Sequence, residues 1–207
     1  MTDFFKVILF LNYGLLLSII ILGAAKYRIL NNKEKQYFHC IAFLFFIELL
    51  NLVLPYIFNL NDTSFLYPLY IAGEFFLLTT LFIRKLELPK YFLGITALLA
   101  CGFMVAKYVY DFPSNSDTVK VISNIAIICL SGFALLREIN GVPVQNRFLL
   151  ADACIFFYYS VSVFIFIIQH QIANLSEHDY YIILSVNNIL SSILYCSFLY
   201  TFIKLKK

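Results

Sequence analysis

The chain has 207 residues, of which 62% are hydrophobic and 13% are charged, and its mean hydropathy is +0.86. A soluble globular domain has about 45–50% apolar and about 25% charged residues, so this composition excludes an ordinary soluble protein. The formal charge of +3 comes from basic residues beside apolar stretches, which excludes the extended basic surface of a nucleic-acid-binding protein.

Seven apolar stretches are long enough to cross a bilayer, for which a helix needs about 20 mostly apolar residues. In chain order they are Val7–Ala25, Phe38–Leu60, Ser64–Ile83, Tyr91–Tyr110, Val119–Leu136, Phe148–Ile168 and Tyr180–Phe202. The short connections between them are rich in Asn, Asp, Ser and Lys, which is typical of turns outside the hydrocarbon. We therefore predict an all-α, polytopic membrane protein. It forms a single seven-helix domain over residues 1–207 with no soluble domain attached.

The basic residues are distributed unequally between the two sides of the predicted membrane. Short loops rich in Lys and Arg stay in the cytoplasm. Twelve of the 15 basic residues lie in the first, third and fifth loops and the C-terminal tail: Lys26, Arg28, Lys33, Lys35, Arg84, Lys85, Lys90, Arg137, Arg147, Lys204, Lys206 and Lys207. The others, Lys6, Lys107 and Lys120, are near helix ends, where a long side chain reaches the interface. We predict an inner (plasma) membrane protein with its N-terminus outside and its C-terminus in the cytoplasm. The same asymmetry disfavours a cleaved signal peptide over the first span.

Three carboxylates fall inside the predicted spans, where a charge costs about 2.5–3.5 kcal/mol on insertion scales and normally finds a partner. Glu48 and Glu74 lie near the middle of adjacent antiparallel spans. We find no Lys or Arg at their depth, and so expect the two carboxyls to lie close together and to share a proton. Asp152 is nearer the end of its span, so we expect interfacial water or Arg147 to anchor it.

Further polar side chains gather in the outer half of the predicted bundle. Together with the two glutamates they form the candidate ligand or proton site: Glu48, Asn51, Tyr70, Glu74, Asn124, Asn187, Asn188 and Ser191. Pro55 and Pro68 each free a backbone carbonyl near the outer helix ends and are expected to widen the mouth. We interpret the set as the lining of a cavity open to the outside. The alternative is that the asparagines and serines only join helices, by hydrogen bonds worth about 0.6 kcal/mol each.

Several residue constellations of known seven-helix functions are absent from the sequence. A retinal protein needs a lysine within the last helix for its Schiff base, and none precedes Lys204 there. A zinc hydrolase needs His and acidic ligands at one level, whereas His39 and the pair His170 and His178 are predicted on opposite sides of the bilayer. All five cysteines lie in apolar stretches, so we expect no disulfide framework. We also expect no enzymatic activity, no metal and no cofactor.

Three segments carry a diffuse resemblance to known proteins: Phe-Phe-Ile-Glu-Leu-Leu-Asn at 45–51, Tyr-Pro-Leu-Tyr-Ile-Ala-Gly-Glu-Phe-Phe at 67–76 and Asn-Asn-Ile-Leu-Ser-Ser-Ile-Leu-Tyr at 187–195. They are similar to segments of small bacterial seven-helix membrane proteins of unassigned function. Such proteins resemble, more loosely, the membrane sensor modules placed ahead of histidine kinases. The resemblance implies a sensor whose output domain is a separate chain.

The leading functional hypothesis is a receptor or sensor. Its outward-facing polar cavity would bind a small-molecule ligand, and its helix ends would signal to a separate cytoplasmic protein. The first alternative is a small proton- or cation-coupled transporter or channel that uses Glu48 and Glu74. The second is a structural subunit whose polar face contacts another membrane protein. All three place the chain in the lipid bilayer and give no role to nucleic acid.

Overall fold

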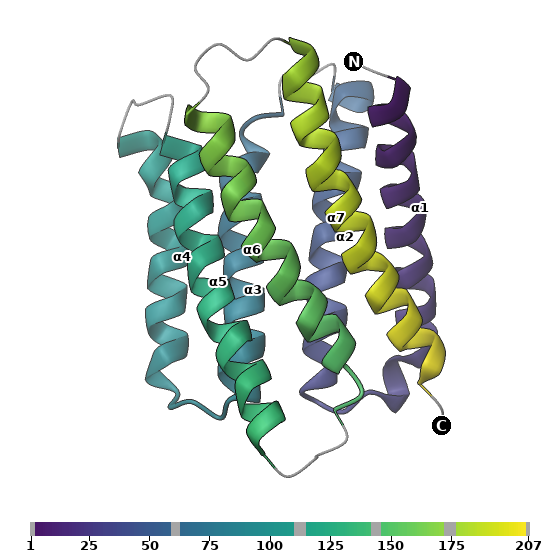
Figure 1. Cartoon of the computed structure of the whole chain (residues 1–207), viewed down its shortest axis with the longest axis vertical. Coiled ribbons are helices and arrows are strands. Elements are labelled where there is room, and N and C mark those ends of the chain that lie inside the picture. Colours follow the sequence, from purple (N-terminus) through teal and green to yellow (C-terminus); the bar gives the residue numbers. More distant parts are fainter. Residues whose placement is uncertain (1–2, 59–62, 110–114, 142–145, 172–176, 206–207) are drawn as a thin grey trace.

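The computed structural model describes residues 3–58, 63–109, 115–141, 146–171 and 177–205. Seven α-helices run side by side through these residues (Figure 1), and no strand is present among them. The helices are α1 Asp3–Lys26, α2 Glu34–Phe58, α3 Leu66–Lys85, α4 Tyr91–Val109, α5 Asn115–Asn140, α6 Leu149–Gln171 and α7 Glu177–Lys204. A short 3₁₀ helix, η1 Tyr27–Ile29, follows α1. The all-α class is therefore confirmed.

In the described residues each predicted span coincides with one helix, and the differences lie at the ends; Asn59, Leu60 and Tyr110 of the predicted spans lie outside the described residues. Helix α5 begins at Asn115 and ends at Asn140, several residues beyond the apolar stretch on both sides, because polar residues outside hydrocarbon can continue a helix. Six helices are long and apolar enough to cross a membrane. In α4 the described residues provide a shorter apolar helix, Tyr91–Val105. These helices support a multi-pass membrane protein.

Six of the helices form a closed ring and the seventh lies outside it. Neighbouring pairs around the ring are α1–α2, α2–α3, α3–α5, α5–α6, α6–α7 and α7–α1, and α4 packs mainly on α3. Helix α3 is consequently the most enclosed of the six spanning candidates. Gly73 lets α2 approach α3 closely, because the ring of Phe43 lies against its backbone where a Cβ would stand. The polar side chains Glu74, Thr79 and Thr80 of α3 are therefore buried in protein.

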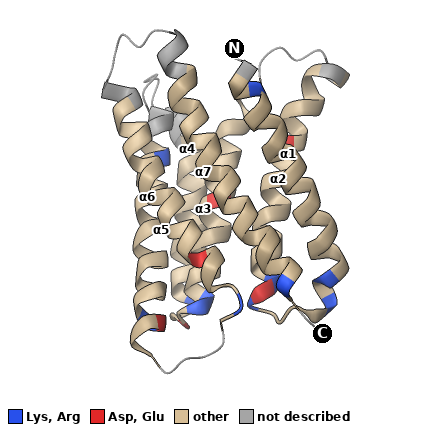
Figure 2. Ribbon diagram, turned by 45° about the vertical axis from the view of Figure 1, so that its right-hand side comes forward, with Lys and Arg blue, Asp and Glu red and all other residues tan. Residues whose placement is uncertain are grey.

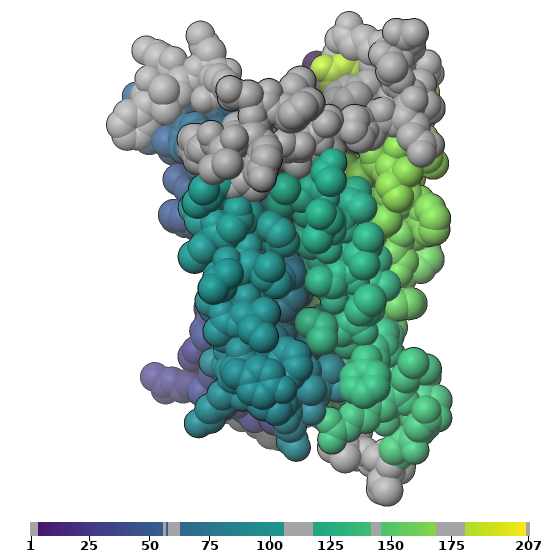
Figure 3. Space-filling view, turned by 90° about the vertical axis from the view of Figure 1, so that its left-hand side faces the viewer, coloured from purple at the N-terminus to yellow at the C-terminus, as the bar shows by residue number. Residues whose placement is uncertain are grey.

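The outer faces of the bundle are apolar. On the face formed by α4 and α5 (Figure 3), Leu98 is 74% exposed and Phe133 is 57% exposed, together with Ile95 and Ile122. A soluble protein rarely exposes contiguous apolar surface of this extent, whereas lipid solvates it without cost. All five cysteines are free thiols in the structure.

Charged residues gather at the end of the bundle that carries the C-terminus (Figure 2). Basic residues occupy the last turns of α1, α3, α5 and α7, where cations interact favourably with the helix dipole. Helix α2 starts at the same end with a capping box: the Asn31 Oδ1 accepts from the Glu34 amide at 2.8 Å, and the Glu34 Oε2 accepts from the Asn31 amide at 2.9 Å. Five helix ends thus bring charged side chains together there.

Candidate functional site

A cavity of about 110 Å³ lies among α1, α2, α3, α6 and α7, and we call it the Glu48 cavity. Its lining consists of Leu9, Asn12, Tyr13, Leu16, Leu44, Glu48, Tyr70, Tyr158, Asn187, Asn188, Ser191 and Tyr195. Five of the eight candidate residues are among them: Glu48, Tyr70, Asn187, Asn188 and Ser191. Five residues that the sequence placed in one cavity lining therefore do line one polar cavity.

Glu48 is the acidic group of this cavity. It is half-buried, and its carboxyl interacts with the hydroxyl of Tyr13 on α1. Among the described residues it forms no ion pair. A carboxylate at bilayer depth without a cation is costly, so its charge needs a proton or a bound cation.

Amide and hydroxyl groups of α1 and α7 form the opposite wall. The Asn12 Nδ2 donates to the backbone carbonyl of Asn188 at 3.0 Å, and the Ser192 Oγ donates to the Asn12 Oδ1 at 2.7 Å. Asn187 accepts a hydrogen bond of 2.8 Å from Ser162 of α6. Sequence reasoning missed Asn12 and Tyr13, although an Asn-Tyr pair within an otherwise apolar span was a usable signal.

Glu74 belongs to a separate buried ion pair. Its Oε2 accepts from the ammonium of Lys120 on α5, and its Oε1 accepts from Tyr70 at 2.8 Å and from Tyr159 at 2.7 Å. The side chains of Glu74 and Lys120 are only 3% and 2% exposed. The ammonium also lies 4.4 Å from the centre of the Tyr70 ring, within cation–π range. Tyr70 lines the Glu48 cavity as well, so one tyrosine joins the cavity to the ion pair.

This ion pair corrects two expectations. Lys120 does not extend to the interface, since α5 begins at Asn115 and directs this side chain into the bundle. The premise that no Lys or Arg lies at the depth of the two glutamates is therefore wrong. Glu48 and Glu74 have different partners, Tyr13 for the first and Lys120 for the second, which removes the reason for expecting a shared proton.

Asn51 and Asn124 do not line the Glu48 cavity, although the sequence placed them in one lining with Asn187 and Asn188. Asn51 is half-buried on α2. Asn124 is fully buried on α5, and neither its Oδ1 nor its Nδ2 has a hydrogen-bond partner among the described residues. A buried amide without partners costs about 1–3 kcal/mol in proteins. We have no physical account of why Asn124 stands here.

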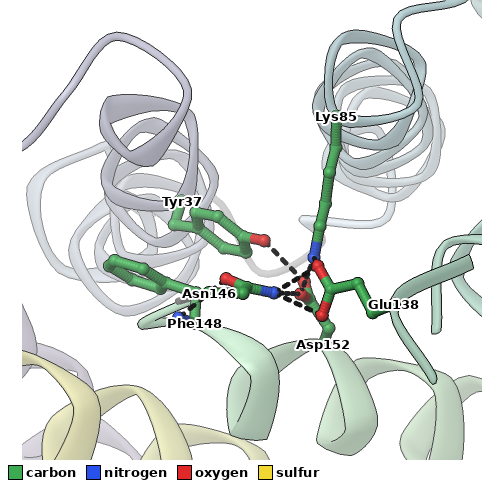
Figure 4. A network of polar contacts seen from close by, with 6 residues as sticks. All are labelled: Tyr37, Lys85, Glu138, Asn146, Phe148 and Asp152. Atoms are coloured by element: carbon green, nitrogen blue, oxygen red, sulfur yellow. Dashed lines mark hydrogen bonds and ion pairs between the residues drawn. The ribbon is translucent and has the colours of Figure 1, made fainter. Parts of the chain in front are cut away.

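A second polar region surrounds Asp152 at the end that carries the C-terminus (Figure 4). Asp152 is fully buried and accepts from the Tyr37 hydroxyl at 2.6 Å, from the Asn146 amide at 3.0 Å and from the ammonium of Lys85. Lys85 also pairs with Glu138 at 2.6 Å, and the Asn146 Nδ2 donates to both Glu138 oxygens. The network around Asp152 thus joins α2, α3, α5 and α6.

The partner expected for Asp152 was wrong. Arg147 instead forms a two-pronged pair with Glu34 at the start of α2, with its Nε at 2.8 Å and its Nη2 at 2.6 Å from the carboxylate oxygens. Asn146, one residue earlier, caps the start of the next helix by accepting from the Phe148 amide at 3.0 Å. At this cap the chain direction places Arg147 against Glu34, so the ion-pair partner of Asp152 is Lys85.

A larger cavity of about 510 Å³ lies beside this network, and we call it the vestibule. Its lining includes Tyr37, Leu81, Leu86 and Ala134 and the charged residues Lys33, Glu34, Lys85, Glu87, Arg137, Glu138 and Arg147. None of these residues lines the Glu48 cavity. Sequence reasoning used these charges only to orient the chain and did not expect a cavity among them.

The described residues contain no group of three or more His, Cys, Asp or Glu side chains arranged to hold a metal ion. Comparisons with protein-family models, with curated proteins and with solved structures find no match to this chain.

Proposed function

We propose that this protein is a small membrane transporter that binds a proton or a small cation at Glu48. The observation that carries the proposal is a carboxyl group at bilayer depth that lines a polar cavity and has no ion-pair partner among the described residues. Burying an isolated carboxylate costs several kcal/mol or more, so the group must take up a proton or a cation. Exchange of that proton or cation between the two sides would be transport.

The size and chemistry of the Glu48 cavity support a small occupant. Ligand sites for drug-sized molecules have volumes of about 300–1,000 Å³, whereas this cavity has about 110 Å³. Oxygen atoms of Asn12, Asn187, Asn188 and Ser191 are available in its lining. Amide and carboxylate oxygens are preferred ligands of hard cations. A proton with water, or one dehydrated cation, fits better than an organic molecule.

The proposal includes the membrane arrangement expected from the sequence. All seven helices cross the inner membrane, including α4, which packs outside the ring of six. The N-terminus then lies outside the cell membrane and the C-terminus lies in the cytoplasm. The basic last turns of α1, α3, α5 and α7 support this orientation through the excess of Lys and Arg in cytoplasmic loops. The cavity then lies nearer the outer side.

A sensor is the second candidate, and a contact between α1 and α7 favours it. These helices form two walls of the cavity through Asn12 and Asn188, and at their other ends Lys26 donates to the carbonyls of Ile203 at 2.9 Å and Leu205 at 2.7 Å. A change in cavity occupancy would shift α7 against α1 and reach the C-terminal end, where a cytoplasmic partner could bind. A subunit role has less support, because the polar residues face the interior of the chain itself.

Reconstitution in proteoliposomes tests the proposal. With an imposed proton or sodium gradient, the wild-type protein should produce flux, and Glu48→Gln should reduce it at least about tenfold because glutamine cannot titrate or carry charge. Asn51→Ala is the matched control, since Asn51 lies one turn away on α2 outside the cavity lining. Undiminished flux in a folded Glu48→Gln variant would refute the transporter. Ion binding that depends on Glu48 without any flux would instead favour the sensor.

A further inference from the structure

The vestibule has the dimensions of a small-molecule site, independently of the Glu48 cavity. Its volume of about 510 Å³ lies within the usual range of about 300–1,000 Å³ for ligand pockets. Its floor is apolar and rigid, because Tyr37, Leu81 and Ala134 are buried by at least 96%. Charged side chains from α3, α5 and the segments preceding α2 and α6 form its walls. Such a cavity suits a ligand with an apolar body and a charged group.

The four cations in the walls differ in how firmly they are bound. Arg147 is held by both oxygens of Glu34, and Lys85 is held by Glu138 and the buried Asp152. Lys33 and Arg137 are held by fewer contacts, which makes them the cations available to a ligand.

Arg137 has most of its hydrogen-bonding capacity unused. Its Nη1 donates to the carbonyl of Leu86 at the end of α3, at 2.7 Å, and no carboxylate lies within ion-pair distance of it among the described residues. A guanidinium carries five N–H donors in a planar fork that matches oxyanions. The Leu86 contact fixes the position of the fork while leaving other donors free to bind.

Lys33 is held only by an exposed partner. Its ammonium lies 2.8 Å from Glu87 Oε1, and the two side chains are 56% and 67% exposed. Exposed ion pairs contribute only about 0–1 kcal/mol, so this bond is easily exchanged. The hydrogen bond and charge of Lys33, followed by the charge of Arg137, hold the pKa of the Glu87 carboxyl below its ordinary value. The Glu87 carboxylate is therefore paired with Lys33, and the charge of Arg137 acts on it from beyond ion-pair distance.

The backbone of Glu87 is unusual as well. Its φ of 57° is the only positive value at a non-glycine residue in the described part of the chain. For a residue with a Cβ, such a conformation costs of order 1–3 kcal/mol and tends to occur at functional sites. A glycine would adopt it freely. What Glu87 adds at this strained position is a carboxylate that pairs with Lys33.

We propose that the vestibule binds a phosphate-bearing ligand whose phosphate oxygens contact Arg137 and displace the Glu87 carboxylate from Lys33. The apolar part of the ligand lies on Tyr37, Leu81 and Ala134. A phosphate monoester has three acceptor oxygens and up to two negative charges, so it competes well against one carboxylate. The arginine fork and the lysine ammonium are the usual protein partners of phosphate. The phosphate belongs either to a soluble metabolite or to a lipid headgroup at the membrane surface.

Phenyl phosphate is a suitable probe, because it combines a phosphate monoester with a small apolar ring. Its binding to the full chain in neutral detergent is measured by isothermal titration and by ³¹P line broadening. Glu87→Gln should bind it about two- to fivefold more tightly, since the competing anion is gone. Lys33→Gln and Arg137→Gln should each weaken binding about tenfold or more. Arg84→Gln is the control, as this exposed arginine of α3 does not line the vestibule.

Two further measurements make the result decisive. Nanodiscs of phosphatidylcholine with and without phosphatidic acid distinguish a lipid headgroup from a soluble metabolite as the source of the phosphate. If the site binds headgroups, phosphatidic acid should occupy it and prevent phenyl phosphate from binding, whereas phosphatidylcholine alone should not. Arg137→Gln loses the Leu86 contact and risks misfolding, so Lys33→Gln, an exposed substitution, carries the test. If neither probe binds, if Glu87→Gln weakens binding, or if Lys33→Gln leaves it unchanged, the site is refuted.

Discussion

The Glu48 cavity and the vestibule hold their charges in opposite ways. The small cavity has one carboxyl, surrounded by neutral amides and hydroxyls, with no ion pair among the described residues. Around the larger vestibule, Glu34, Glu87 and Glu138 each have a basic partner, and Arg137 is the charge without a carboxylate. The first region is therefore suited to a cation or proton and the second to an anion.

Depth in the bundle accounts for this difference. At the C-terminal end the helices terminate, and long basic side chains there reach carboxylates and backbone carbonyls of neighbouring segments. In the interior, each buried charge needs a dedicated partner because water is absent. The Glu74–Lys120 pair meets that requirement and Glu48 does not. The following predictions test how much stability each kind of pairing contributes.

The largest effect is expected at the buried ion pair. Lys120→Met should lower the free energy of unfolding by about 3–5 kcal/mol, because it leaves the Glu74 carboxylate buried without a cation. Unfolding in detergent with increasing dodecyl sulfate measures this. Adding Glu74→Gln to Lys120→Met should recover part of the loss, and Lys90→Met, at an exposed position, should have little effect. A loss below about 1 kcal/mol would mean that water reaches the pair.

A smaller loss is expected at the C-terminal network. Asp152→Ala should cost about 2–3 kcal/mol, since Tyr37 and Asn146 each lose a partner while Lys85 keeps Glu138. Asp152→Asn should cost less because the amide keeps an acceptor for Tyr37. The same unfolding assay compares the two variants. If alanine is no worse than asparagine, these hydrogen bonds contribute nothing to stability.

A loss of about 1 kcal/mol is expected for Asn31→Ala, which removes the cap of α2. Asn31 and Glu34 bond each other reciprocally, and Glu34 also holds Arg147. The variant should therefore also weaken the vestibule wall, which increased hydrogen exchange in the first turn of α2 would reveal. Asn31→Asp retains a capping acceptor and serves as the control. Equal stability of the alanine and aspartate variants would contradict the capping role.

The smallest effect is a pH dependence at Glu87. Because its pKa is held below the ordinary value of 4.5, chiefly by Lys33, the native state favours the ionised carboxylate. The stabilisation is fully present above pH 4.5 and is lost as the pH falls through the lowered pKa. Lys33→Gln should remove this dependence, and the variant and wild type should become equally stable in acid. A gap between them that widens as the pH falls would reverse the assigned sign.

The sequence by itself determined the class and the elements of this protein. Runs of apolar residues of bilayer length must be helical, because hydrocarbon offers no partner for a free N–H or C=O. Seven helices at the expected positions follow from that rule, and the polar residues of α7 could be recognised as cavity-forming in the same way. Asn187, Asn188 and Ser191 were identified because an amide or hydroxyl within such a run must find an interior partner.

Only the tertiary structure decided which polar groups meet. Lipid is as apolar as a leucine side chain, so apolar residues cover a helix on all sides and do not reveal its rotation or its neighbours. Lys120 illustrates this: near the end of an apolar run, a long side chain can turn outward to the interface or inward to Glu74. Asp152 forms an ion pair with Lys85 of α3 and not with Arg147, which is nearer in sequence. The reason is that the cap at Asn146 sets the direction in which α6 starts. The partners of Glu48, Glu74 and Asp152 come from other helices, and only the assembly of the bundle brings these groups together.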